Sequence, residues 1–374
     1  MPQMRACVSI IVFAATWAGI STLFNAHAPI RIADGQGSLA PKQPQACVGS
    51  DGVAHLVYGV GDKVHYSCSK DSGQSFEPPA VAFQVPNMSL GMRRGPRVAV
   101  AGKSIVVTAV GGAKGKGQDG DVLAWRSKDG GASWAGPMKV NDVVDSAREG
   151  LHAMTSGSDG TVWCVWLDLR AKKTELYASQ STDGGDSWSV NTLVYRSPEM
   201  SICQCCHPSI AIDGSMIHVL FRNSLAGDRD MYIVTSNDGG KSFQPAKRLG
   251  LTHWSLNACP MDGGMLAVGP NRKVATVWRR AGELFFTTDN EYESPLGRGE
   301  QPWVASTTQG PIAVWTEGRV GTLRLRSLVE PNSQVLDEQA RDPMIVSNGD
   351  TTIACWESIS DSKSTIVAQR IVAN

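Results

Sequence analysis

One octapeptide occurs four times in this chain and limits the folds that the chain can adopt. The copies begin at Ser69, Ser127, Ser181 and Ser236, and each reads Ser-x-Asp-x-Gly-x-Ser followed by an aromatic residue. In such a pattern the carboxylate accepts backbone N–H groups, the glycine adopts a conformation that other residues avoid, and the aromatic ring packs beneath the turn. The pattern therefore predicts four β-hairpin turns. Their structural aspartates are Asp71, Asp129, Asp183 and Asp238.

The spacing of these turns predicts a β-propeller. Successive copies begin 58, 54 and 55 residues apart, which is the length of a four-stranded sheet with its loops. A strand-like run precedes each copy, so the turn should join the outer two strands of a sheet. A second recurrent segment marks the inner strand of each unit, at residues 46–48, 95–100, 151–154, 206–211, 258–261, 301–304 and 342–345. We therefore expect seven four-stranded blades, with six as the alternative, and a strand near residues 30–33 that closes the ring.

Composition supports an all-β fold and argues against some partners. The 39 glycines, 19 prolines and 11 tryptophans suit many short strands joined by tight turns. The 35 basic and 35 acidic side chains cancel, so no overall positive field attracts nucleic acid or an anionic membrane. We expect a monomer that binds a glycan or another small acidic ligand, and no nucleic acid.

The first 28 residues have the pattern of an export signal. Arg5 precedes an apolar run over residues 8–24, and small residues follow at Ala26-His27-Ala28. Because Pro29 disfavours cleavage after Ala28, an uncleaved N-terminal anchor is the alternative. We expect a signal or anchor over residues 1–28, a propeller domain over 29–374, and a periplasmic or extracellular location, where disulfides are permitted.

The four octapeptides resemble the Asp boxes of bacterial sialidases, and the resemblance extends over nearly all of the predicted domain. In that family the boxes lie at the blade periphery and take no part in chemistry. The resemblance implies an exo-α-sialidase type of glycoside hydrolase that cleaves a terminal acidic sugar and needs no cofactor. Such an enzyme holds the sugar carboxylate with three arginines, and it uses a tyrosine nucleophile paired with a glutamate and an aspartate as acid-base group.

Several residues match the positions of this family. Arg94-Gly95-Pro96 resembles the family's Arg-x-Pro motif. The third arginine corresponds to Arg279 or Arg280, of which we favour Arg280. The catalytic set that the resemblance implies is Arg94, Asp119, Asp121, Arg222, Arg280 and Glu317, with Asp119 or Asp121 as acid-base group and Glu317 bracing the first arginine. The alternative is that these arginines are ordinary ion-paired residues of the blade loops.

The nucleophile of the family is missing from its usual place. Gln301-Pro302 stands where the family has Tyr-Ser, and Cys205-Cys206-His207 replaces the glutamate expected before the strand that leads to Arg222. Tyr195 and Tyr232 are the tyrosines that we consider as substitutes. A non-hydrolytic exported propeller is therefore the second functional hypothesis, with a channel mouth that binds a metal or a partner.

The cysteines supply the chemistry for that second hypothesis. Eight cysteines lie beyond the leader, and soft thiolates with an imidazole suit copper or zinc. The predicted metal ligands are Cys203, Cys205, Cys206, His207 and Cys259. Disulfides are the alternative, for example between Cys259 and either Cys203 or Cys206, and Cys203-x-x-Cys206-His207 also satisfies the covalent haem attachment pattern.

Overall fold

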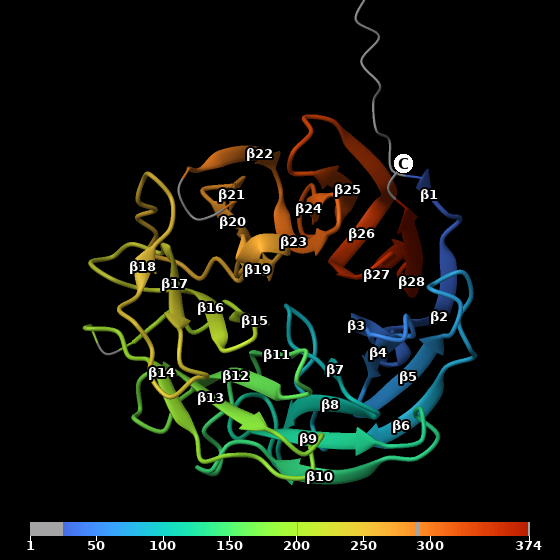
Figure 1. Ribbon diagram of the computed structural model, residues 1–374, viewed down its shortest axis with the longest axis horizontal. Helices are drawn as coiled ribbons and strands as arrows, with labels where there is room; N and C mark the ends of the chain where they lie inside the picture. The colour runs from blue at the N-terminus through green and yellow to red at the C-terminus, as the bar shows by residue number, and fades with distance from the viewer. Residues whose placement is uncertain (1–24, 200, 289–291, 373–374) are drawn as a thin grey trace, which may run out of the picture.

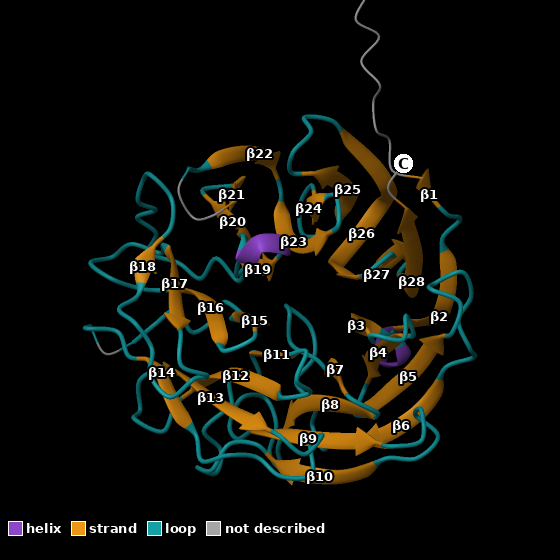
Figure 2. Ribbon diagram, viewed as in Figure 1, coloured by secondary structure: helices purple, strands orange, loops and turns teal. Residues whose placement is uncertain are grey.

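The computed structural model describes residues 25–199, 201–288 and 292–372. Antiparallel sheets in these residues form a ring around a central axis, which is the arrangement of a β-propeller (Figure 1). Two short 3-10 helices, Gly37–Leu39 and Pro270–Arg272, are the helices of the described ranges, and Figure 2 shows how little of the ring they occupy. The predicted all-β class is confirmed. None of the described helices is long and apolar enough to span a membrane.

Five sheets have four strands each, in sequence order from one edge to the other. The first two comprise β3 (Lys42–Val48), β4 (Ala54–Val60), β5 (Lys63–Ser69) and β6 (Ala80–Gln84), then β7 (Arg97–Ala101), β8 (Ser104–Gly111), β9 (Asp121–Ser127) and β10 (Ala135–Lys139). The next two comprise β11 (His152–Ser156), β12 (Val162–Asp168), β13 (Glu175–Ser181) and β14 (Thr192–Tyr195), then β15 (Ser209–Asp213), β16 (Met216–Arg222), β17 (Met231–Ser236) and β18 (Lys247–Arg248). The fifth comprises β19 (Met265–Val268), β20 (Val274–Arg280), β21 (Glu283–Thr288) and β22 (Ser294–Arg298).

The sixth sheet has eight strands because one long strand belongs to two sets of partners. Its members are β1 (Asn25–Ala26), β2 (Ile30–Gln36), β23 (Glu300–Thr307), β24 (Gly310–Thr316), β25 (Gly321–Ser327), β26 (Ser333–Asn348), β27 (Thr351–Ser360) and β28 (Lys363–Val372). The first half of β26 pairs with β25, and the second half pairs with β27 from Ala340 onward, with a register shift between Arg341 and Met344.

The N-terminal strand closes the ring as the sequence predicts. β2 pairs with β28, beginning with Ile30 opposite Ala368, so the two ends of the domain share one sheet (Figure 1). The edge continues into β1, and the backbone N–H of His27 donates to the Arg370 carbonyl at 3.1 Å. Residues 1–24 of the predicted leader lie outside the described residues.

Each octapeptide forms the turn between the third and fourth strands of a sheet, as predicted. In the copy after β9, Asp129 Oδ1 accepts hydrogen bonds from Ser127 Oγ at 2.7 Å and from the Ser133 N–H at 2.9 Å. The Ser133 hydroxyl bonds the second carboxylate oxygen, and the bonds from Ser133 lower the pKa of Asp129 to about 2. The aspartates Asp71, Asp183 and Asp238 make the same set of contacts.

The inner strands surround a central cavity of about 660 Å³. Its walls are formed by parts of β3, β7, β11, β15, β19, β23 and β26. Six of these strands overlap or adjoin the predicted inner segments. The prediction for residues 258–261 is wrong, because β19 begins only at Met265. Pro260 lacks an N–H, and Met261 has a φ of 55°, so the segment leaves the strand ladder.

Candidate functional site

Five buried side chains meet where the inner strands begin, and we refer to them as the mouth cluster. Three of them, Arg93, His207 and Asp262, lie shortly before β7, β15 and β19. The other two, Gln301 and Asp342, lie within β23 and β26. The backbone N–H of Gln301 donates to Asp262 Oδ2 at 2.8 Å. Gln301 Oε1 accepts the Asp342 N–H at 2.7 Å. Loops that are far apart in the sequence are thus joined by side chains.

Trp303 connects the mouth cluster to the central cavity. Its ring lies under the Arg93 guanidinium, 5.2 Å from ring centroid to Cζ, and stacks on His207 with centroids 6.3 Å apart. Trp303 also lines the cavity. Burial, and then the charge of Arg93, lowers the pKa of His207 well below its usual range, so this imidazole is neutral at pH 7.

Arg222, at the end of β16, extends the mouth cluster. Its Nε and Nη2 donate to the Asp262 carbonyl, and its remaining donors reach the carbonyls of Arg229 at 2.5 Å and Arg279 at 2.8 Å. The structure therefore brings Arg222 to the predicted place. Its guanidinium is bonded to backbone carbonyls, and its contact with a sugar carboxylate stays a prediction.

Two further arginines flank the cluster and share one carboxylate. Arg279 Nη2 lies 3.3 Å from Glu300 Oε1, and Arg319 Nε lies 3.6 Å from Glu300 Oε2. The side chains of Arg279 and Arg319 are 19% and 40% exposed, whereas Arg93 is 2% exposed. Solvent thus reaches the outer arginines and not the innermost one.

Several polar atoms at the mouth lack a hydrogen-bond partner within the described part of the chain. They are Arg93 Nε and Nη2, Arg279 Nε, Arg319 Nη1 and Asp262 Oδ1. Burial raises the pKa of Asp262, and the positive charge of Arg93 offsets part of this rise. Buried polar groups are normally paired. Arg93 Nε lies 3.9 Å from Asp342 Oδ1, beyond hydrogen-bond distance, so this concentration of guanidinium donors without a hydrogen bond has the character of an anion-binding site.

Three thiols converge beside the mouth cluster in the loop before β15. Cys203 Sγ lies 3.6 Å from Cys205 Sγ and 3.6 Å from Cys206 Sγ. The eight cysteines of the described residues are all free, so the disulfides considered from the sequence are not formed there. Cys259 is exposed in a loop, because β19 starts later than predicted. The structure therefore gathers three of the five predicted metal ligands.

Comparison with known proteins places this architecture. Residues 96–273 match the family model described as the BNR repeat-like domain. Over these residues the chain is similar to that family. The resemblance inferred from the octapeptides is thereby confirmed. None of the curated proteins matches the sequence.

Solved structures of similar fold include two kinds of glycosidase. A Trypanosoma rangeli sialidase has a TM-score of 0.53 at 15% identity, over 88% of this chain and 53% of that chain. A Hadza microbial sialidase has a TM-score of 0.51 at 15% identity, over 89% and 66%. An α-L-arabinofuranosidase from Fusarium graminearum has a TM-score of 0.53 at 12% identity, over 93% and 98%. This chain thus spans about half of the Trypanosoma rangeli sialidase and about two thirds of the Hadza microbial sialidase. At these sequence identities the likeness shows a shared fold.

Three residues of the predicted catalytic set have partners other than those that the resemblance implies. Arg280 forms a two-fold ion pair with Glu293, at 2.5 and 2.6 Å, and lies over Phe285. Glu317 pairs with Arg324 of the adjacent strand instead of bracing Arg94. Arg94 Nε donates to the Glu149 carbonyl at 2.7 Å. The expectation that Arg94, Arg222 and Arg280 meet around one point is therefore corrected for Arg280.

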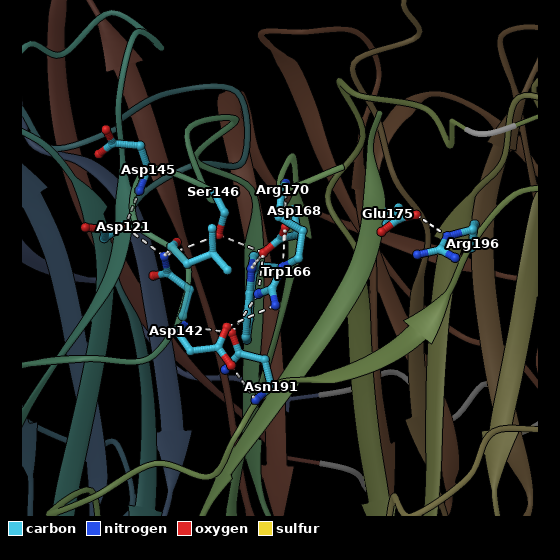
Figure 3. A network of polar contacts seen from close by, with 12 residues as sticks. Asp121, Asp142, Asp145, Ser146, Trp166, Asp168, Arg170, Glu175, Asn191 and Arg196 are labelled. Atoms are coloured by element: carbon cyan, nitrogen blue, oxygen red, sulfur yellow. Dashed lines mark hydrogen bonds and ion pairs between the residues drawn. The ribbon is translucent and has the colours of Figure 1, made fainter. Parts of the chain in front are cut away.

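The two predicted acid-base aspartates are bound within their own loop and sheet. Asp119 accepts the backbone N–H groups of Lys114 and Gly115, both at 2.8 Å, and the bond from Lys114 lowers its pKa most. Asp121 accepts the Asp145 N–H at 2.7 Å and pairs with Lys139 at 2.6 Å. Figure 3 shows Asp121 in a polar network that continues to Asp168 and Arg170. These contacts are structural in character.

Sequence reasoning missed the residues that form the centre of this site. Arg93, Asp262, Glu300 and Arg319 were not singled out, although Arg93 directly precedes the predicted Arg94, and Arg279 was considered but Arg280 was favoured over it. Met92 and Arg93 have φ values of 54° and 65°, so the backbone turns just before the Arg-x-Pro motif. This turn directs Arg93 into the mouth cluster, and no spacing rule reveals it. The two candidate tyrosines, Tyr195 and Tyr232, pack on Phe221.

Proposed function

We propose that this protein is an exported glycoside hydrolase that recognises a carboxylated sugar at the mouth of its propeller. The observation that carries the proposal is the pair of partly exposed arginines, Arg279 and Arg319, each with a guanidinium donor that lacks a hydrogen-bond partner, beside the buried Arg93. A sugar carboxylate would accept these N–H groups in charge-assisted hydrogen bonds, which are stronger than neutral ones. The sialidases and the arabinofuranosidase of similar fold support glycoside hydrolysis as the reaction class.

The chemistry in this proposal differs from that of the standard family. Gln301, at the place of the tyrosine nucleophile, is fully buried, and its Oε1 is bonded to Asp342. Asp262 and Glu300 are two carboxyl groups beside these arginines, since Glu300 lies within 3.6 Å of Arg279 and Arg319, and Arg93 acts on the pKa of Asp262. Asp342 also lies 3.9 Å from Arg93 Nε, but its carboxylate is bonded to the Gln301 side chain. Burial raises the pKa of Asp262, which suits a proton donor, and Glu300 lies between the guanidinium groups of Arg279 and Arg319. We assign them as the acid and the base of hydrolysis.

The proposal includes seven blades. The eight-stranded sheet divides at the register shift within β26 into two sets of four strands, β23 to the first half of β26, and the second half of β26 to β28 with β2. Inner-wall segments from seven strands around the cavity support this division.

Neighbouring arginines on β20 provide a matched test. In Arg279→Ala we expect kcat/KM for carboxylated glycosides to fall at least about tenfold, mainly through KM, because a charge-assisted hydrogen bond contributes about 1.5 to 3 kcal/mol. In Arg280→Ala we expect kcat/KM for the same glycosides to stay within about twofold of the unmodified protein, because the Arg280 guanidinium is paired with Glu293. The measurement is sugar release from a panel of sialosides, uronides and neutral arabinosides. Equal turnover by both variants, or a preference for neutral arabinosides, would contradict the carboxylate site.

A non-hydrolytic propeller is the second candidate, and the buried Gln301 favours it. It predicts saturable binding of a carboxylated sugar by calorimetry, lost in Arg279→Ala, without any sugar release from the same panel. Hydrolysis by the unmodified protein would exclude this reading.

A further inference from the structure

The three thiols beside the mouth cluster are held by a well-fixed segment. The backbone N–H of Cys203 donates to the Arg222 carbonyl at 3.1 Å, and Ile202 donates to Thr174 at 3.0 Å. Ile202 also forms an isolated bridge with Asn223. Cys203 and Cys206 are buried, and Cys205 is half-buried. The thiols are therefore presented in a defined arrangement with one side open to solvent.

Their spacing matches that of ligands to a common metal ion. The three Sγ atoms all lie within 4.8 Å of one another, and two of the pairs are separated by 3.6 Å. Three sulfurs bound to one ion at the ~2.3 Å of a metal–thiolate bond are about 4 Å apart in a trigonal site. Only small shifts would bring all three onto one ion.

We propose that Cys203, Cys205 and Cys206 bind one Cu(I) ion. Thiolates are soft ligands that select Cu(I), zinc or iron–sulfur clusters. Structural zinc requires four ligands, whereas the group of described ligand atoms here contains three. His207 stacks on Trp303, and Cys259 is exposed in another loop. The three-thiol set therefore favours Cu(I) over zinc.

The surroundings compensate the charge of a loaded site. Three thiolates and one Cu(I) carry a net charge of −2, which is costly in a buried place unless it is paired. Arg94 interacts electrostatically with Cys205, and Arg222 does so with Cys203 and Cys206. The two arginines thus have a role beside this site that is separate from sugar binding.

Copper titration of the full chain tests the site. The protein is reduced under anaerobic conditions and titrated with Cu(I) against a competing Cu(I) chelator. We expect one tightly bound equivalent, and X-ray absorption with a shell of three sulfurs around copper. In Cys205→Ser, copper affinity should fall more than about 100-fold, since removing even an outer partner of a metal ligand costs 10- to 100-fold. Cys205 is chosen because its half-buried side chain makes misfolding of the variant least expected.

Matched controls separate this site from other cysteines and from the proposed function. Cys259→Ser should keep the full equivalent, because Cys259 is exposed and outside the group. Arg279→Ala should also keep it, so loss of sugar turnover and loss of copper are distinguishable. Circular dichroism checks the fold of each variant, and the sulfur count from the unmodified protein does not depend on any variant. Absence of a stoichiometric Cu(I), unchanged affinity in Cys205→Ser, or tighter binding of Zn²⁺ in competition would each overturn the proposal.

Discussion

At the scale of single residues, the glycine of each octapeptide does more than allow a turn. Gly131 and Gly240 have φ values of 96° and 80°. A Cβ at Gly131 would lie 2.1 Å from Tyr66 of the preceding sheet, and one at Gly240 would lie 2.2 Å from Trp163 of the sheet before it. The turn therefore packs its glycine directly against the neighbouring sheet. The same residue thus fixes the hairpin and the contact between sheets.

Two adjacent glycines allow these effects to be separated. Gly239 also has a positive φ, 71°, but a Cβ there would meet nothing within 4 Å. Gly239→Ala should cost about 1 kcal/mol from backbone strain alone. Gly240→Ala should cost about 3 kcal/mol, because overlap with Trp163 adds to the strain. Urea unfolding of both variants measures the difference, and equal losses would show that the contact between sheets does not matter.

At the scale of secondary-structure elements, β2 is the strand that joins the two ends of the chain. Its pairing with β28 runs from Ile30 opposite Ala368 to Gln36 opposite Lys363. Ile32 packs against the largest hydrophobic cluster, which contains Trp315 and Trp356. The closing strand is thus tied to the core by a side chain as well as by its hydrogen bonds.

Truncation of Ile32 tests that tie. Ile32→Ala should lower the free energy of unfolding by about 1 to 2 kcal/mol, less than the 2 to 5 kcal/mol of a fully buried site because Ile32 is half-buried. Arg31→Ala, an exposed position on the same strand, should change it by less than about 0.5 kcal/mol. Chemical denaturation of both variants provides the measurement. Equal, small effects would indicate that closure depends on backbone pairing alone.

Strand alternation explains why the fold could be predicted and the site only in part. The octapeptides carry their turn chemistry within eight residues, so local sequence is sufficient to predict hairpins and their spacing to predict sheets. The site instead depends on which of two adjacent arginines faces the mouth. Because neighbouring strand residues point to opposite faces, one step in register separates Arg279, beside Glu300, from Arg280, beside Glu293. The sequence pattern contains no signal for that step, nor for the turn at Arg93.

At the scale of the whole molecule, burial keeps most of the described histidines neutral. The pKa is lowered below its usual value for His55, His65, His152, His207 and His218, and burial is the first cause in each case. A histidine that resists protonation in the folded state binds fewer protons than in the unfolded chain. Its contribution to stability is therefore present above pH 6.5 and is lost as the pH falls toward the folded pKa. The pKa values of Asp262 and Glu357 are raised in the folded state. These two groups therefore contribute to a rise in the free energy of unfolding as the pH falls from 7, opposite to the histidines.

His152 isolates the histidine contribution from these opposing carboxyl groups. Burial, and then the charge of Arg97, lowers its pKa to about 3, and its Nε2 lies 3.0 Å from Thr108 Oγ1. Between pH 6 and 4 this single proton changes the free energy of unfolding by about 1.4 kcal/mol per pH unit. His152→Gln removes the titrating group, so the free energy of unfolding should fall less steeply between pH 6 and 4, by up to about 1.4 kcal/mol per pH unit. The variant should also be less stable than the unmodified protein at pH 7. Urea unfolding at pH 6, 5 and 4 measures the slopes, and identical slopes for the unmodified protein and His152→Gln would mean that His152 is already protonated in the folded molecule.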